Sequence, residues 1–579
     1  MRISKSTSVC LTAAAGAALA IAAFAAVPAS VSAASAQVYR AVPVCAAPKA
    51  HHASCFAMKL KKVAAGTAGA RRLTANSSYT TGPAGGFTPN DLAKAYGVSN
   101  TAPITNQVVG IVDAYDDPNA LADLNAFDSH YGLPAETSTS FRKVSQTGST
   151  TTLPTADAGW AGEESLDLDA VRGLCNNCKI ILVEANSSAF TDLAAAENKA
   201  VSLGATEITN SYGGAESGAI DSSIASAYKH SGVVITASTG DHGLFDWDNY
   251  NVGGTSSSAP SVPSSLNTVV AVGGTTLYLN SDATRSGETV WNENGSSDVA
   301  GANTQYSLGA SGGGCSTQVA AQKWQRSVSG YSQTGCGTFR DAGDIAALAD
   351  PYTGYDIYDT YQSSGWATYG GTSLASPLIA AMWALAGGSG GVAYPSLSLY
   401  GHQKSAATTS LFDVTSGGNG ICDGTPAGAC ASYLFGGTSP NAEGYGVLDC
   451  AWNNAGTALN PAGTKECDAA TGYDGPSGVG APKGSSVFKP MSPTAVITPP
   501  TTITHATSAS FSASSSTDPF PGGSISSYAW TFGDGTSTTT TTSSTVTHTY
   551  AAAGSFTVTL KVTDNYSRSA TTSTTVTVH

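Results

Sequence analysis

The sequence predicts an α/β domain with a mainly parallel sheet flanked by helices, followed by a C-terminal all-β sandwich. Short apolar runs alternate with amphipathic stretches in the first part, and buried strands that alternate with helices form a parallel sheet covered on both faces. The runs lie at 108–112, 179–183 and 233–237, and the stretches near 119–131, 161–173, 190–203 and 219–230. Beyond residue 494, polar and apolar residues alternate at 508–512, 527–532 and 555–562, which is typical of half-buried strands.

Residues 1–36 have the features of a secretory signal peptide. Arg2 and Lys5 supply positive charge, an apolar stretch runs from about residue 9 to 27, and small residues such as Ala34 and Ala36 offer a cleavage site. The chain is therefore expected to be secreted and extracellular, with no membrane contact after the signal is removed. A membrane anchor is the alternative, although no second apolar run approaches the roughly 20 residues of a membrane span.

The rest of the chain divides into three parts. Residues 37–90 are expected to be an irregular N-terminal extension or a short pro-segment, in which Arg71-Arg72 is a candidate processing site. Residues 91–488 form the α/β domain. Pro and Gly residues around 482–493 indicate a linker, and residues 489–579 form the β-module, with a polar loop at 538–542.

Charge and cysteine content limit the function classes. The net charge is −14 and only 11% of residues are charged. This argues against nucleic acid as a partner, because its phosphates need clustered Lys and Arg, and it suits an acidic medium.

The cysteine content indicates disulfides. Eleven cysteines include Cys10 in the signal, and the ten that remain suit disulfides in an oxidising compartment. Pairing between sequence neighbours would give five bridges, but the sequence does not determine connectivity. Cys175-Asn-Asn-Cys178 is alternatively a redox or zinc motif.

The strongest chemical motif is Gly370-Gly371-Thr372-Ser373-Leu374-Ala375-Ser376-Pro377. Small residues before Ser373 allow a tight turn and close approach of a substrate backbone. The apolar run after it places Ser373 at a helix N-terminus, where free N–H groups favour an oxyanion. Ser373 is a candidate nucleophile, and a plain helix-capping serine is the alternative. The Gly-Thr-Ser-x-Ala-x-Pro string resembles the nucleophile segment of subtilisin-fold peptidases.

A serine nucleophile needs a base, and no histidine in this sequence is placed to be one. Subtilisins use a His-Gly-Thr-His type helix, which is missing among the nine histidines. Asp113 looks like the aspartate of the subtilisin triad, but it has no histidine partner in the sequence. A histidine-dependent mechanism is therefore excluded.

Carboxylates are the candidates to replace a histidine as the base. In the stretch 160–169, Glu163 and Asp167 stand at i and i+4, which puts their Cβ atoms about 6 Å apart on one helix face. Two carboxylates in a partly desolvated site cannot both ionise cheaply, so one holds a proton at mildly acidic pH. Glu163 could then be the general base for Ser373, oriented by Asp167, whereas Glu164 and Asp169 point elsewhere. An exposed acidic helix start is the alternative.

Asp241 is a third candidate. The segment Ser238-Thr239-Gly240-Asp241 follows the run at 233–237, at the C-terminal end of a strand where α/β sites form. A protonated Asp241 could donate to a tetrahedral oxyanion, and a simple turn aspartate is the alternative.

These motifs together resemble the sedolisins, the serine-carboxyl peptidases with a subtilisin-like fold. Glu163-x-x-Leu-Asp167, Ser238-x-Gly-Asp241 and Gly371-Thr-Ser373 occur in the family's order, over roughly 90–488. The resemblance implies Glu163, Asp167 and Ser373 as a catalytic triad, Asp241 as oxyanion donor, and hydrolysis of proteins or peptides through an acyl-enzyme at acidic pH. It also implies that Ser211, Tyr212 and Gly213 bind the substrate. We expect a monomer.

The same resemblance implies one structural calcium ion. Calcium prefers six or more oxygens, mixing carboxylates with carbonyls. The segments 412–417 and 472–476 are similar to those of the sedolisin calcium site. The implied ligands are Asp413, Val414, Ala470, Gly472 and Asp474, and the family usually has glycine where Ala470 stands. Two unrelated turn aspartates are the alternative, with Asp423 and Asp468 as local competitors.

The C-terminal module resembles the PKD domain, an immunoglobulin-like sandwich. The resemblance is carried by Trp530-Thr531-Phe532-Gly533-Asp534-Gly535 and His548-Thr549-Tyr550. Such a module is expected to act as a spacer or to contact a polymeric substrate.

Two other functions remain open. One is a catalytically inert secreted binding protein on a peptidase scaffold. The other is a two-carboxylate glycoside hydrolase using Glu163, which leaves the Gly-Thr-Ser segment unexplained. Sedolisins also carry a long folded pro-domain, whereas little more than 50 residues separate the signal from the core here.

Overall fold

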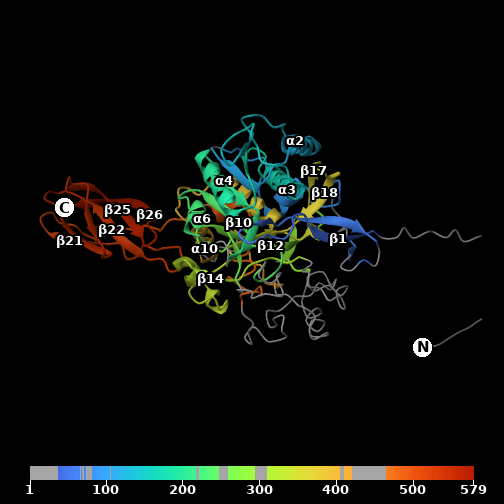
Figure 1. Ribbon diagram of the computed structural model, residues 1–579. Helices are drawn as coiled ribbons and strands as arrows, with labels where there is room; N and C mark the ends of the chain where they lie inside the picture. The colour runs from blue at the N-terminus through green and yellow to red at the C-terminus, as the bar shows by residue number, and fades with distance from the viewer. Residues whose placement is uncertain are drawn as a thin grey trace, which may run out of the picture.

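A computed structural model describes residues 37–64, 67, 71–72, 81–104, 106–216, 221–246, 259–293, 309–404, 410–419 and 465–579. The predicted signal, 1–36, lies outside them. Within these ranges, no helix is both long and apolar enough to cross a membrane. The β-sandwich extends from one side of the larger α/β domain (Figure 1).

A central eight-stranded sheet organises the α/β domain. Its strand order is β13-β12-β10-β8-β5-β7-β6, with β16 also paired to β12. Every pairing is parallel except that of β12 with β13. The strands are β5 (Val108–Ala114), β6 (Phe141–Ser145), β7 (Lys179–Ala185), β8 (Glu207–Asn210), β10 (Val234–Ser238), β12 (Val270–Leu279), β13 (Arg285–Val290) and β16 (Ile345–Leu348).

Helices cover both faces of this sheet, as the apolar strand runs predict. Helices α3 (Ala158–Leu174) and α9 (Thr372–Ala386) pack on one face and contact each other, and α4 (Phe190–Ser202) packs on the other. Each face of the sheet has its own hydrophobic core. Along β5, Val109 and Ile111 belong to the core that includes α3 and α9, and Val112 and Ala114 belong to the core that includes α4. The remaining helices are α1 (Pro89–Tyr96), α2 (Ala120–Tyr131), α6 (Ser222–Ala227), α8 (Lys323–Ser327) and α10 (Ser396–Lys404).

The expectation that residues 37–90 are irregular is wrong. Strands β1 (Val38–Pro43) and β3 (Met58–Val63) form an antiparallel hairpin, which β4 (Arg71–Arg72) extends. Strand β3 pairs with β18 (Gly365–Gly370), itself paired with β17 (Tyr355–Asp359). Between β1 and β3, β2 (Ser54–Cys55) pairs with β9 (Tyr212–Ala215), which also pairs with β11 (Ser261–Val262). This segment is therefore structured by pairing with strands that are distant in the sequence.

Three disulfides are present among the described residues, each between sequence neighbours. They join Cys45 to Cys55, Cys175 to Cys178, and Cys315 to Cys336. The disulfide reading of Cys175-Asn-Asn-Cys178 is confirmed. Cys467 is also disulfide-bonded, and Cys422, Cys430 and Cys450 lie outside the described residues. Short strand pairs β14 (Cys315–Ala320) with β15 (Phe339–Asp341) and β19 (Leu411–Phe412) with β20 (Ala481–Pro482) complete the domain.

The C-terminal module is a two-sheet antiparallel sandwich. One sheet pairs β21 (Ser508–Ser512) with β24 (Thr545–Thr549). The other has the order β23-β22-β25-β26, made of β23 (Thr539–Thr541), β22 (Ile525–Thr531), β25 (Gly554–Asp564) and β26 (Ser569–Val578). The predicted polar loop at 538–542 is thus an edge strand, because threonine is favoured in strands.

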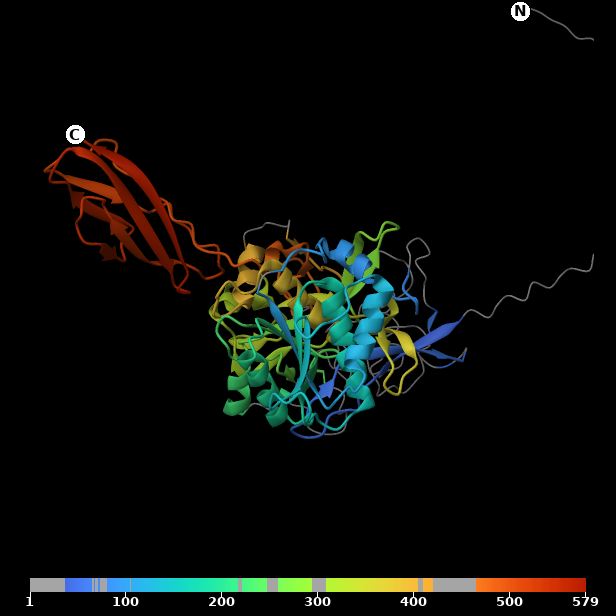
Figure 2. The same ribbon diagram turned by 90° about the horizontal axis from the view of Figure 1, so that it is seen from above.

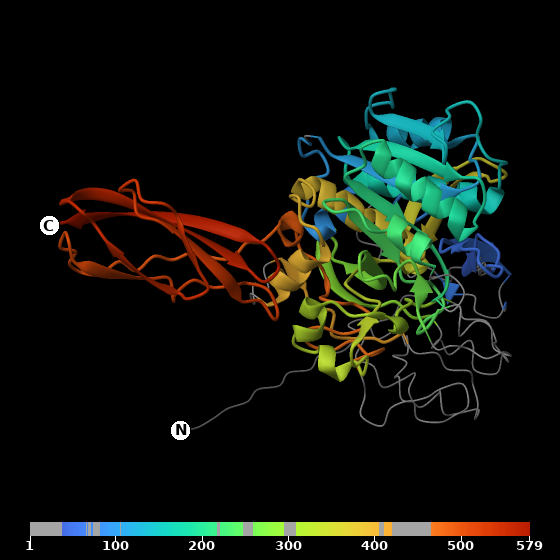
Figure 3. The same ribbon diagram turned by 60° about the vertical axis from the view of Figure 1, so that its left-hand side comes forward.

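The boundary between the two parts is more ordered than the predicted linker at 482–493. Residues Ser485–Phe488 form a 3-10 turn, and the buried Phe488 packs on Trp383 of α9 with 4.9 Å between ring centroids. Tyr566 of the sandwich contacts Trp324 of α8 with 5.6 Å between ring centroids. The sandwich therefore touches the α/β domain at one end and points away from it, as Figures 2 and 3 show.

Candidate active site

Helix α3 carries two of the predicted carboxylates into the interior. Asp157 caps it by accepting from the backbone N–H groups of Gly159 at 2.9 Å and Trp160 at 3.1 Å. Glu163 and Asp167 are both fully buried. The alternative of an exposed acidic helix start is therefore wrong. Asp169 accepts from the backbone N–H of Tyr358 at 2.8 Å, so it points elsewhere as predicted.

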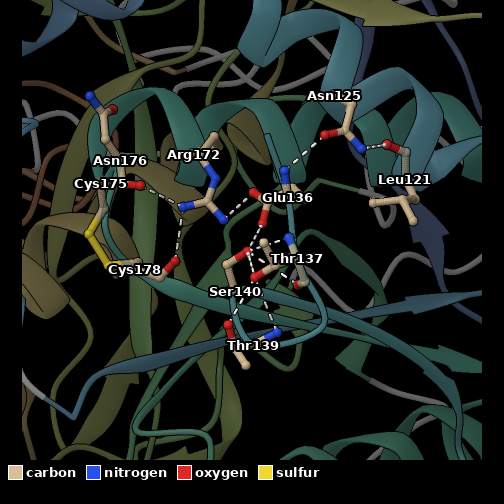
Figure 4. A network of polar contacts seen from close by, with 10 residues as sticks. All are labelled: Leu121, Asn125, Glu136, Thr137, Thr139, Ser140, Arg172, Cys175, Asn176 and Cys178. Carbon is tan, nitrogen blue, oxygen red and sulfur yellow. Dashed lines mark hydrogen bonds and ion pairs between the residues drawn. A yellow bond between two sulfur atoms is a disulfide. The ribbon is translucent and has the colours of Figure 1, made fainter. Parts of the chain in front are cut away.

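The other end of α3 is held by Arg172 (Figure 4). Its guanidinium donates to the carbonyl oxygens of Asn176 at 2.8 Å and Cys178 at 2.9 Å, and it forms an ion pair with Glu136. Both charged side chains are almost completely buried. The loop closed by the Cys175–Cys178 disulfide is thus tied to the helix that carries the carboxylates.

Ser373 lies in the first turn of α9, as predicted, and is fully buried. Gly371 precedes this turn with φ +91°, and a Cβ there would stand 1.9 Å from the carbonyl oxygen of Phe56. Glycine is therefore needed at 371 for both its conformation and its closeness to another backbone. The Ser373 hydroxyl donates to the carbonyl oxygen of Ser211 at 3.2 Å.

Ser211 joins the serine to the carboxylates. Its hydroxyl donates to Asp167 Oδ1 at 2.8 Å and lies 3.3 Å from the carbonyl oxygen of Ser373. Burial raises the pKa of Glu163 well above its usual range, and the nearby Asp167 carboxyl raises it further. The Ser373 hydroxyl acts in the opposite direction on the same pKa. Burial likewise raises the pKa of Asp167, so the Glu163–Asp167 pair holds a proton to a higher pH than exposed carboxyls do.

Asp241 follows β10 and faces the first turn of α9. Its Oδ1 accepts from the backbone N–H of Thr372 at 2.7 Å and from the Thr372 hydroxyl at 2.8 Å. Its Oδ2 is buried and has no hydrogen-bond partner among the described residues. Burial raises the pKa of Asp241 well above its usual range, more than the Thr372 bonds lower it. A protonated Asp241 thus directs a free donor at the space beside Gly371.

Comparisons with known proteins agree with this geometry. Residues 154–433 match the subtilase family. Sedolisin from Pseudomonas sp. (strain 101) is 31% identical over 361 residues, which cover 60% of this chain and 58% of the relative. A solved structure of Pseudomonas sedolisin, a serine-carboxyl proteinase complexed with two molecules of pseudo-iodotyrostatin, covers 70% of this chain and 98% of its own, with a TM-score of 0.53 at 28% identity. The α/β domain of this chain is thus similar to sedolisin in sequence and in fold.

The sandwich at the end of the chain has its own match. Residues 490–578 match the PKD domain. Xanthomonalisin from Xanthomonas sp. (strain T-22) is 33% identical over 370 residues, which cover 57% of this chain and 42% of the relative. The chain thus spans about half the length of the curated relatives that it matches.

In the α/β domain, the segment predicted to bind substrate lies beside Ser373. Tyr212 and Gly213 begin β9, directly after Ser211. The chain's own residues Ser54 and Cys55 pair with this strand, and the backbone N–H of Ala57 donates to Glu163 Oε2 at 2.8 Å. No sequence motif predicts this contact.

The predicted calcium ligands come from two adjacent segments. The backbone N–H of Gly472 donates to the Asp413 carboxylate at 3.1 and 3.2 Å, and that of Ala470 donates to Asp474 Oδ2 at 2.9 Å. Burial raises the pKa of Asp474 to about 7. Burial also raises the pKa of Asp413, and the Lys465 ammonium opposes the rise for both aspartates, so a positive charge already lies nearby.

This oxygen set fits a hard cation, since two carboxylates and neighbouring backbone carbonyls are what calcium prefers. Across the described ranges, no group of three or more His, Cys, Asp or Glu side chains could hold a metal. An ion at this place would therefore depend on backbone oxygens, including those of the buried Val414, of Ala470 and of Gly472.

Sequence reasoning missed Asp246. Asp246 Oδ1 accepts from the backbone N–H groups of Asp241 at 2.9 Å and His242 at 3.0 Å, and so positions the Asp241 loop. It also did not predict that Asp113 lies close to Asp167. Burial raises the pKa of Asp113 well above its usual range, and the carboxyls of Asp167 and Glu184 raise it further. No local motif predicts these contacts, because the residues meet only through the fold.

Proposed function

We propose that this chain is a secreted, acid-active serine-carboxyl endopeptidase that cleaves proteins through an acyl-enzyme on Ser373. The observation that carries the proposal is the convergence of three buried groups. The Ser373 hydroxyl interacts with the Glu163 carboxyl and donates to the carbonyl oxygen of Ser211. Asp241 accepts from the backbone N–H of Thr372, the residue before Ser373, and its Oδ2 lies beside Gly371. The match to sedolisin supports the same reaction class.

The residues divide the work as follows. Glu163 takes the proton of Ser373 as its oxygen attacks the peptide carbonyl, and Asp167 steadies the charge on Glu163. Protonated Asp241 donates from Oδ2 to the oxyanion that forms, which costs no rearrangement because Thr372 already holds Oδ1. Glu163 then protonates the leaving amine, and water releases the acyl group by the reverse proton route.

This division requires acidic pH. Asp241 must carry a proton, so activity falls as the pH rises through its elevated pKa. Glu163 must be able to accept a proton, so activity also falls at the acid extreme. A bell-shaped dependence on pH is expected.

The test is cleavage of a denatured protein across acidic and neutral pH. Ser373→Ala should abolish cleavage, and Glu163→Gln should abolish it at every pH because an amide accepts no proton. Asp169→Asn is a matched control, since that carboxylate accepts from a backbone N–H away from the site. Cleavage confined to alkaline pH, or retained by Ser373→Ala, would refute the proposal, and a wild type that cleaves at no pH would favour the inert scaffold.

The second part of the proposal is one structural calcium ion held by Asp413, Asp474 and the carbonyls of Val414, Ala470 and Gly472. An ion that binds only the folded state stabilises it by an amount that grows with the logarithm of the ion concentration relative to its Kd. Chelation should therefore lower the Tm by several degrees and added calcium should restore it, as measured by differential scanning calorimetry. Asp413→Asn should show a lower Tm that no longer responds to calcium. A Tm that chelation leaves unchanged in the wild type would contradict the site.

The third part concerns the setting of the enzyme. Residues 1–36 are proposed to direct secretion, and the PKD domain is proposed to contact polymeric substrates beside the sedolisin domain. We expect the enzyme to act as a monomer on protein or peptide substrates.

A further inference from the structure

Residues 52–57 lie beside the candidate active site, between β9 and the segment around Ala189, and include the short strand β2. On one side, Ser54 and Cys55 pair antiparallel with Gly213 and Tyr212 of β9. On the other side, the backbone N–H of Ala53 donates to the carbonyl oxygen of Ser188 at 2.8 Å, and that of Phe190 donates to His51 at 3.2 Å. Peptides bound as added strands are held in this way, by main-chain hydrogen bonds to a groove wall.

The bond between Phe56 and Ala57 lies at the candidate catalytic groups. The backbone N–H of Phe56 donates at 3.2 Å to the same Ser211 carbonyl oxygen that accepts from the Ser373 hydroxyl. On the far side of the bond, the backbone N–H of Ala57 donates to Glu163 at 2.8 Å. The amide nitrogen that would leave on cleavage thus faces the group proposed to protonate it.

The carbonyl oxygen of Phe56 lies near the proposed oxyanion donor. A Cβ built on Gly371 would stand 1.9 Å from the Phe56 carbonyl oxygen and 2.5 Å from Asp241 Oδ2. This Asp241 oxygen is buried without a hydrogen-bond partner among the described residues. The carbonyl and the donor thus lie beside the residue that begins the turn carrying Ser373, as a productive complex requires.

Gly213 makes room for the side chain before this bond. A Cβ on Gly213 would stand 2.7 and 2.8 Å from ring carbons of Phe56. An aromatic residue is thus accommodated because position 213 has no side chain.

We infer that Phe56–Ala57 is the first bond that this enzyme cleaves, in its own chain, and that residues 52–57 block the site until then. The inference rests on the proposed function. The Ser373 oxygen bonds to the Phe56 carbonyl carbon, its proton passes through Glu163 to the Ala57 nitrogen, and the carbon–nitrogen bond breaks. Water then hydrolyses the ester, which leaves a carboxyl group on Phe56 and a free amine on Ala57.

The surrounding contacts hold the uncut bond in place. The Cys45–Cys55 disulfide ties the residue before Phe56 to the segment that follows β1. In that segment, the backbone N–H of Val44 donates to the Ala57 carbonyl oxygen at 3.1 Å. Beyond the bond, Met58 and Lys59 pair with Gly370 and Tyr369, just before the nucleophile. Both sides of the bond are therefore anchored, and the released segment leaves only when β1 separates from β3.

The experiment moves the purified full chain from mildly alkaline to acidic pH. Intact mass and N-terminal sequencing follow the chain, while a fluorescent denatured protein reports activity. The wild type should acquire an N-terminus at Ala57, with a lag in activity that matches the cut. Ser373→Ala should stay intact. Ala57→Pro, which lacks the N–H that contacts Glu163, should stay uncut with activity about tenfold lower, because a tethered segment competes at millimolar effective concentration.

Two further variants complete the design. Phe56→Gly keeps the backbone and should be cut about tenfold more slowly, since it leaves the space beside Gly213 empty. Lys61→Ala, at an exposed position of β3, should be cut like the wild type.

The outcomes separate this inference from the proposed function. A wild type that degrades the denatured protein without a lag, with Phe56–Ala57 intact, overturns the inference and leaves the peptidase. Cutting of Ser373→Ala at the wild-type rate also overturns it, because another protease is then responsible. A wild type that cleaves neither the denatured protein nor itself overturns both.

Discussion

At the scale of single residues, burial gives a carboxyl group two opposite uses in this site. Burial raises the pKa of Asp241 well above its usual range, which favours the protonated form that the proposed mechanism requires of an oxyanion donor. Glu163 is equally buried but shares its surroundings with Asp167, so one proton can pass within that pair. The same residue chemistry therefore supplies both a donor and a base.

Asp241→Ala is the prediction that tests this use. Loss of one oxyanion donor should lower kcat by about 100- to 1000-fold with little change in KM, because the contact forms only in the transition state. Steady-state kinetics on a peptide substrate measures this. The exposed Asp282→Ala should leave kcat unchanged. If kcat for Asp241→Ala stayed within threefold of wild type, the activation free energy would have risen by less than about 1 kcal/mol. Another group would then be the main oxyanion donor.

At the scale of elements, α3 is held at both ends, so its carboxylates have fixed positions. Asp157 caps its start, and Arg172 ties its end to Glu136 and to the loop closed by Cys175–Cys178. The pairing of Glu163 with Asp167 followed from helical spacing alone. The role of Arg172 did not, because Glu136 lies 36 residues away in the chain and meets it only in the folded protein.

Arg172→Met should destabilise the domain strongly. It leaves Glu136 buried without its partner, and breaking a buried ion pair costs about 3–5 kcal/mol. Urea unfolding followed by circular dichroism measures the loss as a lower midpoint. The double variant Arg172→Met with Glu136→Gln should recover part of the stability, since no charge is then left unpaired. A single variant as stable as the wild type would show that the pair does not anchor α3.

At the scale of the whole molecule, many carboxyl groups are buried, and this shapes its response to pH. Burial raises the pKa of Glu184 and of Glu207 to about 8, and that of Asp117 to about 7. In the unfolded chain such groups titrate near 4. Between these values the folded state binds more protons than the unfolded state, so folding is favoured by acid.

Stability should therefore be greatest near pH 4 and should decline as the pH rises toward about 8. Each group contributes a slope of at most about 1.4 kcal/mol per pH unit within its own window. Calorimetric Tm values across this range measure the decline. Glu207→Gln should give a shallower decline, because the amide does not titrate. A Tm that rises with pH would contradict the assignment.

The sequence by itself determined the local chemistry and the layering. Strand and helix periodicity predicted the α/β domain and the sandwich, spacing paired Glu163 with Asp167, and the motif around Ser373 placed it in the first turn of α9. These features depend on neighbours within a few residues. Only the tertiary structure decided that Asp246 supports Asp241, that the segment 37–63 contains three strands, and that Phe56 and Ser373 both donate to the carbonyl oxygen of Ser211. Long-range backbone pairing specifies these contacts, and no local pattern records its partner.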